Sequence, residues 1–318
     1  MMRGSSRQTL RVVTRGSALA RWQTEAVAEG LRRAWPGLEV RVELILTRGD
    51  ADPSDRLVGR LDKGFFTAEL EDALLGGRAD VAVHSLKDLP TTAPEGLALG
   101  AVLARGPVED WLLIRPSAFA PDRPGLPLQA GARVGTSAPR REALIRRWAP
   151  DATPLPLRGN VPTRVQRLRE GRYEAIVLAA AGLTRLELDL SDLVVLGLDP
   201  TRYVPAPGQG AIAVQQRAED AETAALLAPL HHPPTADAVS LERALLAAAE
   251  AGCAAAFGAL ATDRDLIWAQ QGPLGWRRHR VRREALGHPP APDELKALLV
   301  DPNTLWEEHD AQPRHTRL

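Results

Sequence analysis

The sequence predicts an α/β protein built on mostly parallel sheets, and the order of its elements is the first reason. The strand-like segment Thr9–Val13 is followed by apolar residues at helical spacing from Leu19 to Trp35, and then by the alternating segment Leu38–Leu46. The second reason is that an amphipathic segment, Phe65–Leu75, precedes the apolar strand Val81–Val83. Strands that alternate with helices of this length are typical of α/β sheets.

The ends of these first elements are also visible in the sequence. Ser17 is well placed to cap the first helix, which Pro36 and Gly37 end. In the next strand, every second residue from Val40 to Leu46 is apolar, so these side chains share one face. The helix at Phe65–Leu75 ends at Gly76-Gly77.

Two interruptions of the pattern predict how the chain divides into domains. The alternation breaks at Arg105–Asp110 and at Tyr203–Gly210, on either side of three further strand-to-helix junctions and the strand at 111–114. A strand at 211–215 and an Ala-rich helix at Ala236–Ala251 follow the second break. We therefore expect a discontinuous α/β domain 1 (1–105 plus 209–230), an α/β domain 2 (106–208) and a small domain 3 (231–318). The last residues, about 307–318, are expected to be frayed.

Composition excludes several classes of function. The chain has 40 basic and 40 acidic side chains, so no overall charge attracts it to nucleic acid or to an anionic membrane. Its single cysteine, Cys253, excludes an internal disulfide and a cysteine-clustered zinc site. The sequence has no apolar signal segment and no apolar run long enough to span a bilayer. We expect a cytoplasmic protein that binds neither nucleic acid nor membrane and holds no metal.

Cationic and polar residues follow the predicted strands, at the ends where α/β sheets bind ligands. Helix N-termini and arginine side chains both favour carboxylate or phosphate groups. Several such ends would together hold a ligand with several negative groups. The residues in these positions are Arg15, Ser17, Arg48, Asp50, Lys87, Asp88, Thr136, Ser137, Arg140, Arg141, Arg158, Gly159, Asn160, Arg164 and Arg185.

Four local features bear on alternative interpretations. The junctions contain no GxxxxGK[ST] or GxGxxG motif, which weakens a nucleotide hypothesis. Asp88 could form an ion pair with Lys87, or it could stabilise a transient positive charge. Cys253 could be an inert core residue or an exposed thiol after Gly252. His231 and His232 precede Pro233 without partners at metal-ligand spacing, which favours a structural role.

A set of motifs running from about residue 10 to residue 260 resembles the porphobilinogen deaminases, also called hydroxymethylbilane synthases. The most specific are HSLKD at 84–88, LRGN at 157–160 and the lone cysteine after Gly252. The other matching segments are TRGSALARWQ, LTRGD, DKGFF, ELEDALL, GTSAPRRE, LAAAGLTRL, PAPGQGA and ERALLAAAEAGC. The resemblance implies two domains like periplasmic binding proteins and a small α+β C-terminal domain.

The resemblance also implies an activity, that of a transferase in porphyrin and heme biosynthesis. Members of the family join four porphobilinogen molecules head to tail into hydroxymethylbilane and release ammonia at each step. A dipyrromethane cofactor, bound through a thioether, primes this reaction, and its cysteine corresponds to Cys253. Asp88 corresponds to the catalytic carboxylate. A monomer is expected.

Further positions match family residues that bind the cofactor and the substrate. Ser85, Lys87, Thr136, Arg140, Arg141, Arg158 and Gly159 match cofactor-binding positions. Arg15, Ser17, Lys63, Arg164 and Arg185 match substrate-binding positions. His84 is expected to be a hydrogen-bonding residue at the strand end and not a general base.

The chain departs from the family pattern at several motif positions. Leu61-Asp62 precede Lys63 where the family has two glycines, Ala138-Pro139 replace a serine and its neighbour, and Pro162 replaces a glycine. Ala251 precedes Gly252-Cys253 in place of a glycine. Two alternatives to the enzyme follow: a non-catalytic cytoplasmic polyanion-binding protein, for which a two-domain cleft would also serve, and an inactive paralogue.

Overall fold

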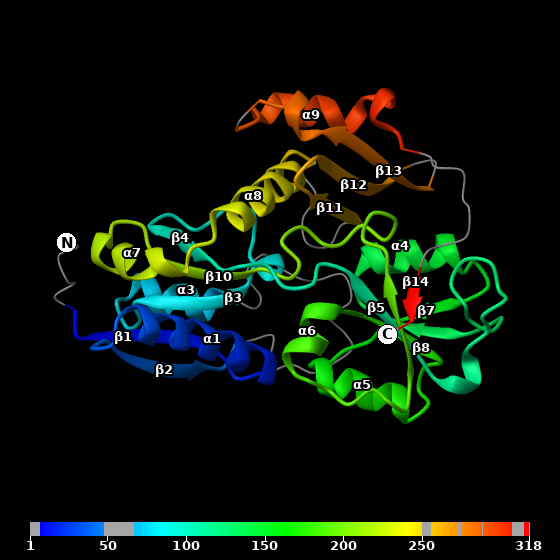
Figure 1. The fold of residues 1–318 in the computed structure, drawn as a ribbon, viewed down its shortest axis with the longest axis horizontal. Coiled ribbons are helices and arrows are strands. Elements are labelled where there is room, and N and C mark those ends of the chain that lie inside the picture. Colours follow the sequence, from blue (N-terminus) through cyan, green and yellow to red (C-terminus); the bar gives the residue numbers. More distant parts are fainter. Residues whose placement is uncertain are drawn as a thin grey trace. The chain divides into compact units, whose positions relative to one another are not determined.

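The computed structural model describes residues 7–47, 67–249, 256–272, 275–287 and 289–306, together with the backbone of 315–317. Its elements are shown in Figure 1. The chain divides into two compact units, the first formed by Met1–Pro53, Asp62–Gly106 and Gly210–Asp237. The second is formed by Ser54–Leu61, Pro107–Gln209 and Ala238–Leu318. The division into three domains at residues 105, 208 and 230 remains a prediction.

The first unit contains a mixed sheet in the order β2-β1-β3-β10-β4. These strands are β2 (Glu39–Ile45), β1 (Thr9–Arg15), β3 (Val81–Ser85), β10 (Ile212–Arg217) and β4 (Leu97–Val102). β1 is parallel to β2 and β3, and β10 is antiparallel to β3 and β4. The carboxyl ends of β1, β2 and β3 therefore lie at one edge of the sheet.

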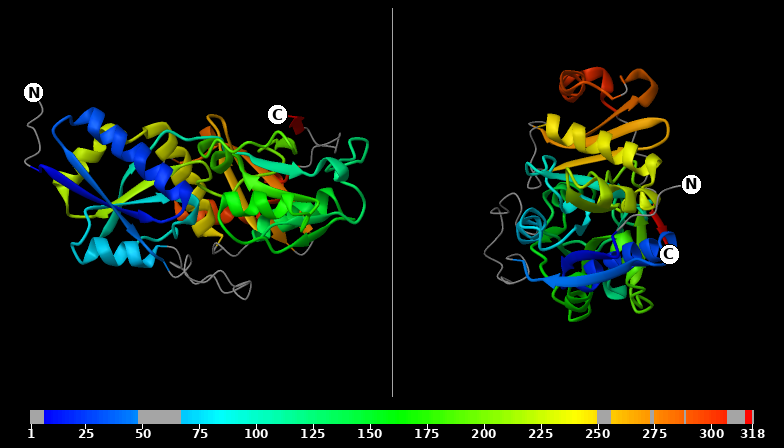
Figure 2. Two further views of the ribbon diagram at one scale, coloured as in Figure 1. Left: turned by 90° about the horizontal axis from the view of Figure 1, so that it is seen from below. Right: turned by 90° about the vertical axis from the view of Figure 1, so that its left-hand side faces the viewer.

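Helices cover both faces of this sheet, as the left view in Figure 2 shows. Helix α1 (Ala18–Ala34) packs Val27 and Leu31 against alternate residues of β1, β3 and β10, and α7 (Ala221–Leu227) adds to the same core. Helix α3 (Ala68–Leu75) packs Leu70 and Leu74 on the opposite face. The periodicity predicted both α1 and α3.

The second unit contains a sheet in the order β14-β9-β5-β8-β6-β7. Its strands are β14 (His315–Arg317), β9 (Val194–Leu198), β5 (Asp110–Ile114), β8 (Ala175–Ala179), β6 (Arg133–Gly135) and β7 (Thr153–Leu155). Helix α4 (Pro139–Trp148) covers one face, and α5 (Val161–Arg169) and α6 (Ala180–Arg185) cover the other. A short 3₁₀ turn at Pro116–Ala118 follows β5, and another, Ala228–Leu230, follows α7 in the first unit.

A smaller antiparallel sheet, β11-β12-β13, belongs to the same unit. It consists of β11 (Phe257–Ala261), β12 (Asp265–Gly272) and β13 (Gly275–Arg282). One face packs against the core that contains α4, and the other packs against α8 (Pro233–Ala248) and α9 (Pro292–Val300). The α/β prediction with a small α+β part is thus confirmed.

Most strands of each sheet run in one direction, as predicted, but each sheet also contains reversed strands that were not predicted. In the first sheet β10 runs against β1, β2, β3 and β4, and in the second β5 and β14 run against β6, β7, β8 and β9. β5 and β10 directly follow the two interruptions, so no crossover helix fixes their direction. One prediction is wrong: the C-terminal residues are not all frayed, since His315–Arg317 pair with Leu196–Leu198 along the open edge of β9.

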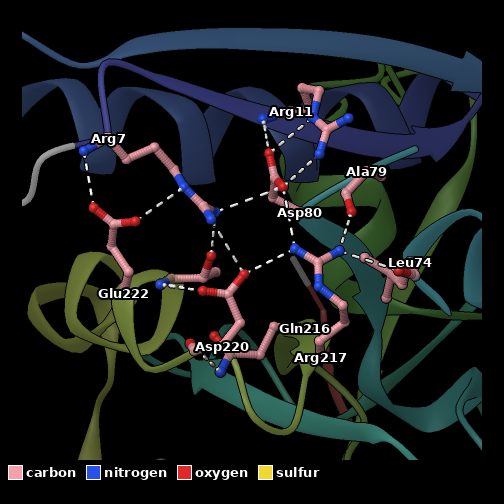
Figure 3. A network of polar contacts seen from close by, with 10 residues as sticks. Arg7, Arg11, Leu74, Ala79, Asp80, Gln216, Arg217, Asp220 and Glu222 are labelled. Atoms are coloured by element: carbon pink, nitrogen blue, oxygen red, sulfur yellow. Dashed lines mark hydrogen bonds and ion pairs between the residues drawn. The ribbon is translucent and has the colours of Figure 1, made fainter. Parts of the chain in front are cut away.

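A network of charged groups holds together the amino ends of β1 and β3 in the first unit (Figure 3). Asp80 is 3% exposed and accepts hydrogen bonds from the backbone N–H, Nε and Nη2 of Arg11 at 2.8–3.1 Å. It also accepts one from Arg217 Nη2 at 3.2 Å and pairs with Arg7 at 3.5 Å. Burial acts to raise the pKa of Asp80, but the hydrogen bonds and charge of Arg11 outweigh it, so the pKa is lowered.

We expect Asp80→Asn to destabilise the first unit by about 3 kcal/mol, because three guanidinium groups lose their shared carboxylate. Amide hydrogen exchange of β1 and β3 would measure this loss within the first unit. Glu25→Gln is the control, because Glu25 forms an exposed pair with Arg32 at 2.6 Å in the same unit and its loss should cost less than about 1 kcal/mol. Equal effects of the two substitutions would contradict a stabilising role for the network.

Candidate active site

The HSLKD motif forms the end of β3 and the turn that follows it in the first unit. β3 is buried from Val81 to His84, and the chain then makes a 3₁₀ turn, Leu86–Asp88. The fully buried Leu86 donates its N–H to Ala211 O at 3.0 Å, and Leu89 donates to Leu86 O at 3.1 Å. These leucines anchor the turn, which leaves the Asp88 side chain exposed at the carboxyl edge of the sheet.

Other predicted site residues lie at the same edge of the first sheet. Arg15 is the last residue of β1, and Ser17 caps α1 by accepting a hydrogen bond from Ala20 N at 3.3 Å. Ser85 is the last residue of β3, next to β1. Its hydroxyl accepts a hydrogen bond from Gln23 Nε2 at 2.8 Å, so Gln23, which the sequence analysis did not single out, fixes the Ser85 side chain.

His84 is a buried neutral residue behind this edge. Its side chain is 5% exposed, and its Nε2 has no hydrogen-bond partner within the described part of the chain. Burial lowers its pKa to about 4, with a further contribution from the charge of Arg15 and an opposing one from Gln215. A neutral imidazole at neutral pH is compatible with the predicted hydrogen-bonding role.

In the second unit, the described site residues lie in the loops and helices that follow the carboxyl ends of the parallel strands β6, β7 and β8. Thr136 follows β6 and accepts a hydrogen bond from Ala138 N at 3.2 Å at the start of α4. Pro139 and Pro162 lie in the first turns of α4 and α5, where proline is compatible with a helix. The two departures from the family pattern therefore leave both helices intact.

The loop between β7 and α5 carries Arg158 and Gly159. Asn160 caps α5 by accepting hydrogen bonds from Thr163 N at 3.0 Å and from its hydroxyl at 2.8 Å. Gly159 has φ +99° and an added Cβ would lie 2.8 Å from Thr163 Cγ2, so this turn requires glycine. Arg164 in α5 donates from Nε to Gly159 O at 2.7 Å and stabilises the loop.

Arg140 and Arg141 are buried, 4% and 7% exposed, around the fully buried carboxylate of Asp110. Each donates from Nη2 to one Asp110 oxygen at 2.7 Å. Their Nη1 groups donate to Val204 O at 2.9 Å and Val177 O at 3.1 Å. Burial opposes ionisation of Asp110, but the two guanidinium charges lower its pKa well below the ordinary value, and burial lowers the pKa of Arg140.

Two guanidinium groups in the second unit each have an N–H group that could donate a hydrogen bond to a bound anion. The Nε atoms of Arg141 and Arg158 are buried without a hydrogen-bond partner in the part of the chain that the structure describes. Leaving such donors unsatisfied is costly, and a carboxylate of a ligand would satisfy them. The residues present therefore fit a cofactor that carries carboxylate groups.

The other predicted residues are only partly placed. Arg185 ends α6, and burial lowers its pKa from the ordinary value. Lys63 and Cys253, as well as Arg48 and Asp50, lie outside the described residues. The described site residues thus form two groups, one in each compact unit.

Asp110 and Gln209 were missed as site residues in the sequence. Asp110 was seen only as the end of an interruption, and its place directly before the apolar segment Trp111–Ile114 is a weak signal, since aspartate is mostly exposed and is fully buried only when paired. Gln209 lies in the PAPGQGA segment and gives no such signal, since a glutamine in a Gly- and Pro-rich stretch resembles an ordinary loop residue.

The fold and these residues define a class of protein: α/β units that gather cations and one exposed carboxylate at the carboxyl ends of strands. Residues 10–225 match the family model described as "Porphobilinogen deaminase, dipyromethane cofactor binding domain". The chain belongs to the porphobilinogen deaminase family. No helix among the described residues is long and apolar enough to cross a membrane.

Curated relatives match over most of their length. The chain is 44% identical to the porphobilinogen deaminase of Roseiflexus castenholzii over 90% of this chain and 93% of that protein. It is 47% identical to that of Moorella thermoacetica over 83% and 82% of the two chains. Similar solved structures include the Bordetella pertussis BvgS periplasmic VFT2 domain, 16% identical with a TM-score of 0.43 over 70% of this chain and 86% of that chain.

We expect His84 to remain neutral down to about pH 4. Because its pKa is about 6.5 in an unfolded chain, the unfolded state takes up a proton first as the pH falls. The His84 contribution to stability should therefore fall by about 2 kcal/mol between pH 8 and pH 5. NMR titration of the imidazole, assigned with His84→Gln, would measure the pKa, and a value near 6.5 would contradict the prediction.

Proposed function

We propose that the protein is a porphobilinogen deaminase, which joins four porphobilinogen molecules into hydroxymethylbilane and releases ammonia at each step. The observation that carries the proposal is the turn Leu86–Asp88, in a chain of this family, whose buried leucine fixes an exposed carboxylate at the carboxyl edge of the sheet. We further propose that it acts as a cytoplasmic monomer.

Asp88 is the proposed catalytic carboxylate. A carboxylate on a fixed turn accepts hydrogen bonds from pyrrole N–H groups and stabilises the positive charge that develops on them during condensation. Its exposure leaves it open to substrate, while the anchoring of Leu86 and Leu89 limits its movement. Fixed negative charge lowers the barrier because little reorganisation is needed when positive charge forms.

The cations at the strand ends are the proposed partners of the acetate and propionate side chains. Guanidinium groups bind carboxylates through two parallel hydrogen bonds, which gives geometric selectivity as well as affinity. We propose that Lys87, Ser85, Thr136, Arg140, Arg141, Arg158 and Gly159 bind the cofactor. We propose that Arg15, Ser17, Lys63, Arg164 and Arg185 bind the substrate.

Cys253 is the proposed attachment point of the dipyrromethane. When bound, this group supplies the nucleophilic pyrrole carbon to which the first substrate unit is added. The Nε groups of Arg141 and Arg158, which have no hydrogen-bond partner among the described residues, support the choice of an anionic cofactor in the second unit. Arg158 and Arg141 would hold the cofactor carboxylates and orient the pyrrole rings.

Intact mass of the denatured protein tests cofactor attachment. We expect an added mass equal to two linked porphobilinogen-derived pyrroles, which peptide mapping should place on Cys253. Cys253→Ser should lack this mass because the thioether cannot form. A bare Cys253 in wild-type protein, even after incubation with porphobilinogen, would favour a binding protein or an inactive relative.

Asp88→Asn tests the catalytic role, because it removes the charge and keeps the shape of the side chain. We expect turnover of porphobilinogen to fall at least about 100-fold while the cofactor mass remains. Glu95→Gln is the control, since Glu95 is an exposed carboxylate in the same unit. Wild-type turnover in Asp88→Asn would refute the assignment.

A further inference from the structure

The two segments on which the chain crosses between its units are hydrogen-bonded to each other. The chain leaves the first unit at Gly106–Pro107 and returns to it at Gln209–Gly210. Gly106 N donates to Gly210 O at 3.1 Å, and Gln209 Nε2 donates to Val108 O at 2.7 Å. We refer to 106–110 and 206–210 as the crossover segments. Gln209 joins them through its fully buried side chain.

Gln209 also reaches the buried carboxylate that holds the arginine pair. Its Nε2 lies 2.9 Å from Asp110 Oδ1, the same oxygen that accepts from Arg141 Nη2 at 2.7 Å. Asp110 is itself the last residue of the first crossover segment and the first residue of β5. One carboxylate therefore connects both crossover segments to Arg140 and Arg141.

The charge of this cluster is not balanced within it. Two guanidinium groups surround one carboxylate, which leaves a net charge of about +1 at a site where Asp110 is 0% exposed. This count covers only these three groups, since another buried carboxylate, Glu242, accepts a hydrogen bond from Gly208 N at 2.7 Å. An excess of buried charge is costly, and Arg141 Nε also lacks a hydrogen-bond partner within the described residues. One further carboxylate, bound at Arg141, would offset the excess positive charge of Arg140, Arg141 and Asp110 and would satisfy this donor.

A purely structural role explains the cluster less well. One arginine and one aspartate would join α4 to β5 with balanced charge, whereas the second buried guanidinium adds a desolvation cost that its bonds to Asp110 and to one backbone carbonyl offset only in part. The excess charge and the unsatisfied donor point to a ligand, and the bond to Gln209 points to the crossover segments. The unsatisfied donor is Arg141 Nε, and the bond from Gln209 goes to Asp110 Oδ1, so the two observations are independent.

We propose that Asp110 and Gln209 are positioning residues that couple carboxylate binding at Arg140 and Arg141 to the hydrogen bonding of the crossover segments. This inference rests on the proposed function, because the carboxylate is taken to belong to the pyrrole cofactor. A carboxylate bound at Arg141 offsets the excess positive charge and so stabilises the arrangement of Asp110 and the two arginines. Gln209, which bonds both Asp110 and Val108 O, then holds the two crossover segments together more firmly. Loading with the cofactor therefore closes the crossover segments more tightly.

Hydrogen exchange of loaded and unloaded protein tests the coupling. Wild-type protein and Cys253→Ser are compared, with intact mass reporting which of them carries the cofactor. We expect exchange in peptides covering 106–112 and 204–212 to be about tenfold slower in the loaded protein. Gln209→Met should abolish this difference, while slowing near the start of α4 at Arg140 and Arg141 remains.

Gln129→Met is the matched control. Gln129 is an exposed glutamine of the same unit that also donates to a backbone carbonyl, Ser117 O, at 2.7 Å. This variant should keep the full slowing in the crossover peptides. If Gln209→Met does not fold, Gln209→Asn serves instead, because its shorter side chain cannot reach both Val108 and Asp110.

Two results would overturn the coupling. One is equal slowing of the crossover peptides in Gln209→Met and wild type, and the other is no slowing in loaded wild-type protein. A wild-type protein whose mass shows no adduct would overturn the proposed function itself, and with it the ligand assumed for the arginine pair. Intact mass thus tests the proposed function, and hydrogen exchange tests the coupling.

Discussion

The buried carboxylate of Asp110 is the interaction on which the second unit depends. A charge without solvent contact is tolerated only where its partners are fixed, so Asp110 sets the positions of Arg140 and Arg141 and, through them, the start of α4. The same carboxylate fixes the beginning of β5, the central strand between β8 and β9. The cations proposed to bind ligand are thus also part of the unit's internal structure.

The first unit uses charge in a different way. Its network around Asp80 lies at the amino ends of β1 and β3, and its arginines are 22–47% exposed, so solvent shares the charge. The opposite edge carries Asp88 on a turn held by apolar contacts and backbone hydrogen bonds. Charge therefore stabilises one edge of the sheet, while the other edge keeps an ionisable group available for chemistry.

Local patterns in the sequence predicted the elements and the edge at which the site residues lie. Spacing is enough for α1, whose apolar residues recur every three or four positions, and for the turn after β3, which Pro90 closes. The reversed direction of β5 and β10 was not predictable, because these strands pair with strands far away in the sequence. The partners of Arg140 and Arg141 were not predictable either, since a pattern of residues gives the position of a guanidinium group but not the carboxylate that it meets.

The position of β10 constrains the order in which the protein is made and folded. This strand lies between β3 and β4, but more than 100 residues separate it from β4 in the chain, and all of β5 to β9 come between. On the ribosome, the first sheet is incomplete until residues 212–217 have emerged. The N-terminal part of the protein therefore finishes folding after the strands of the second sheet that precede β10 have been synthesised, and these long-range contacts favour slow folding.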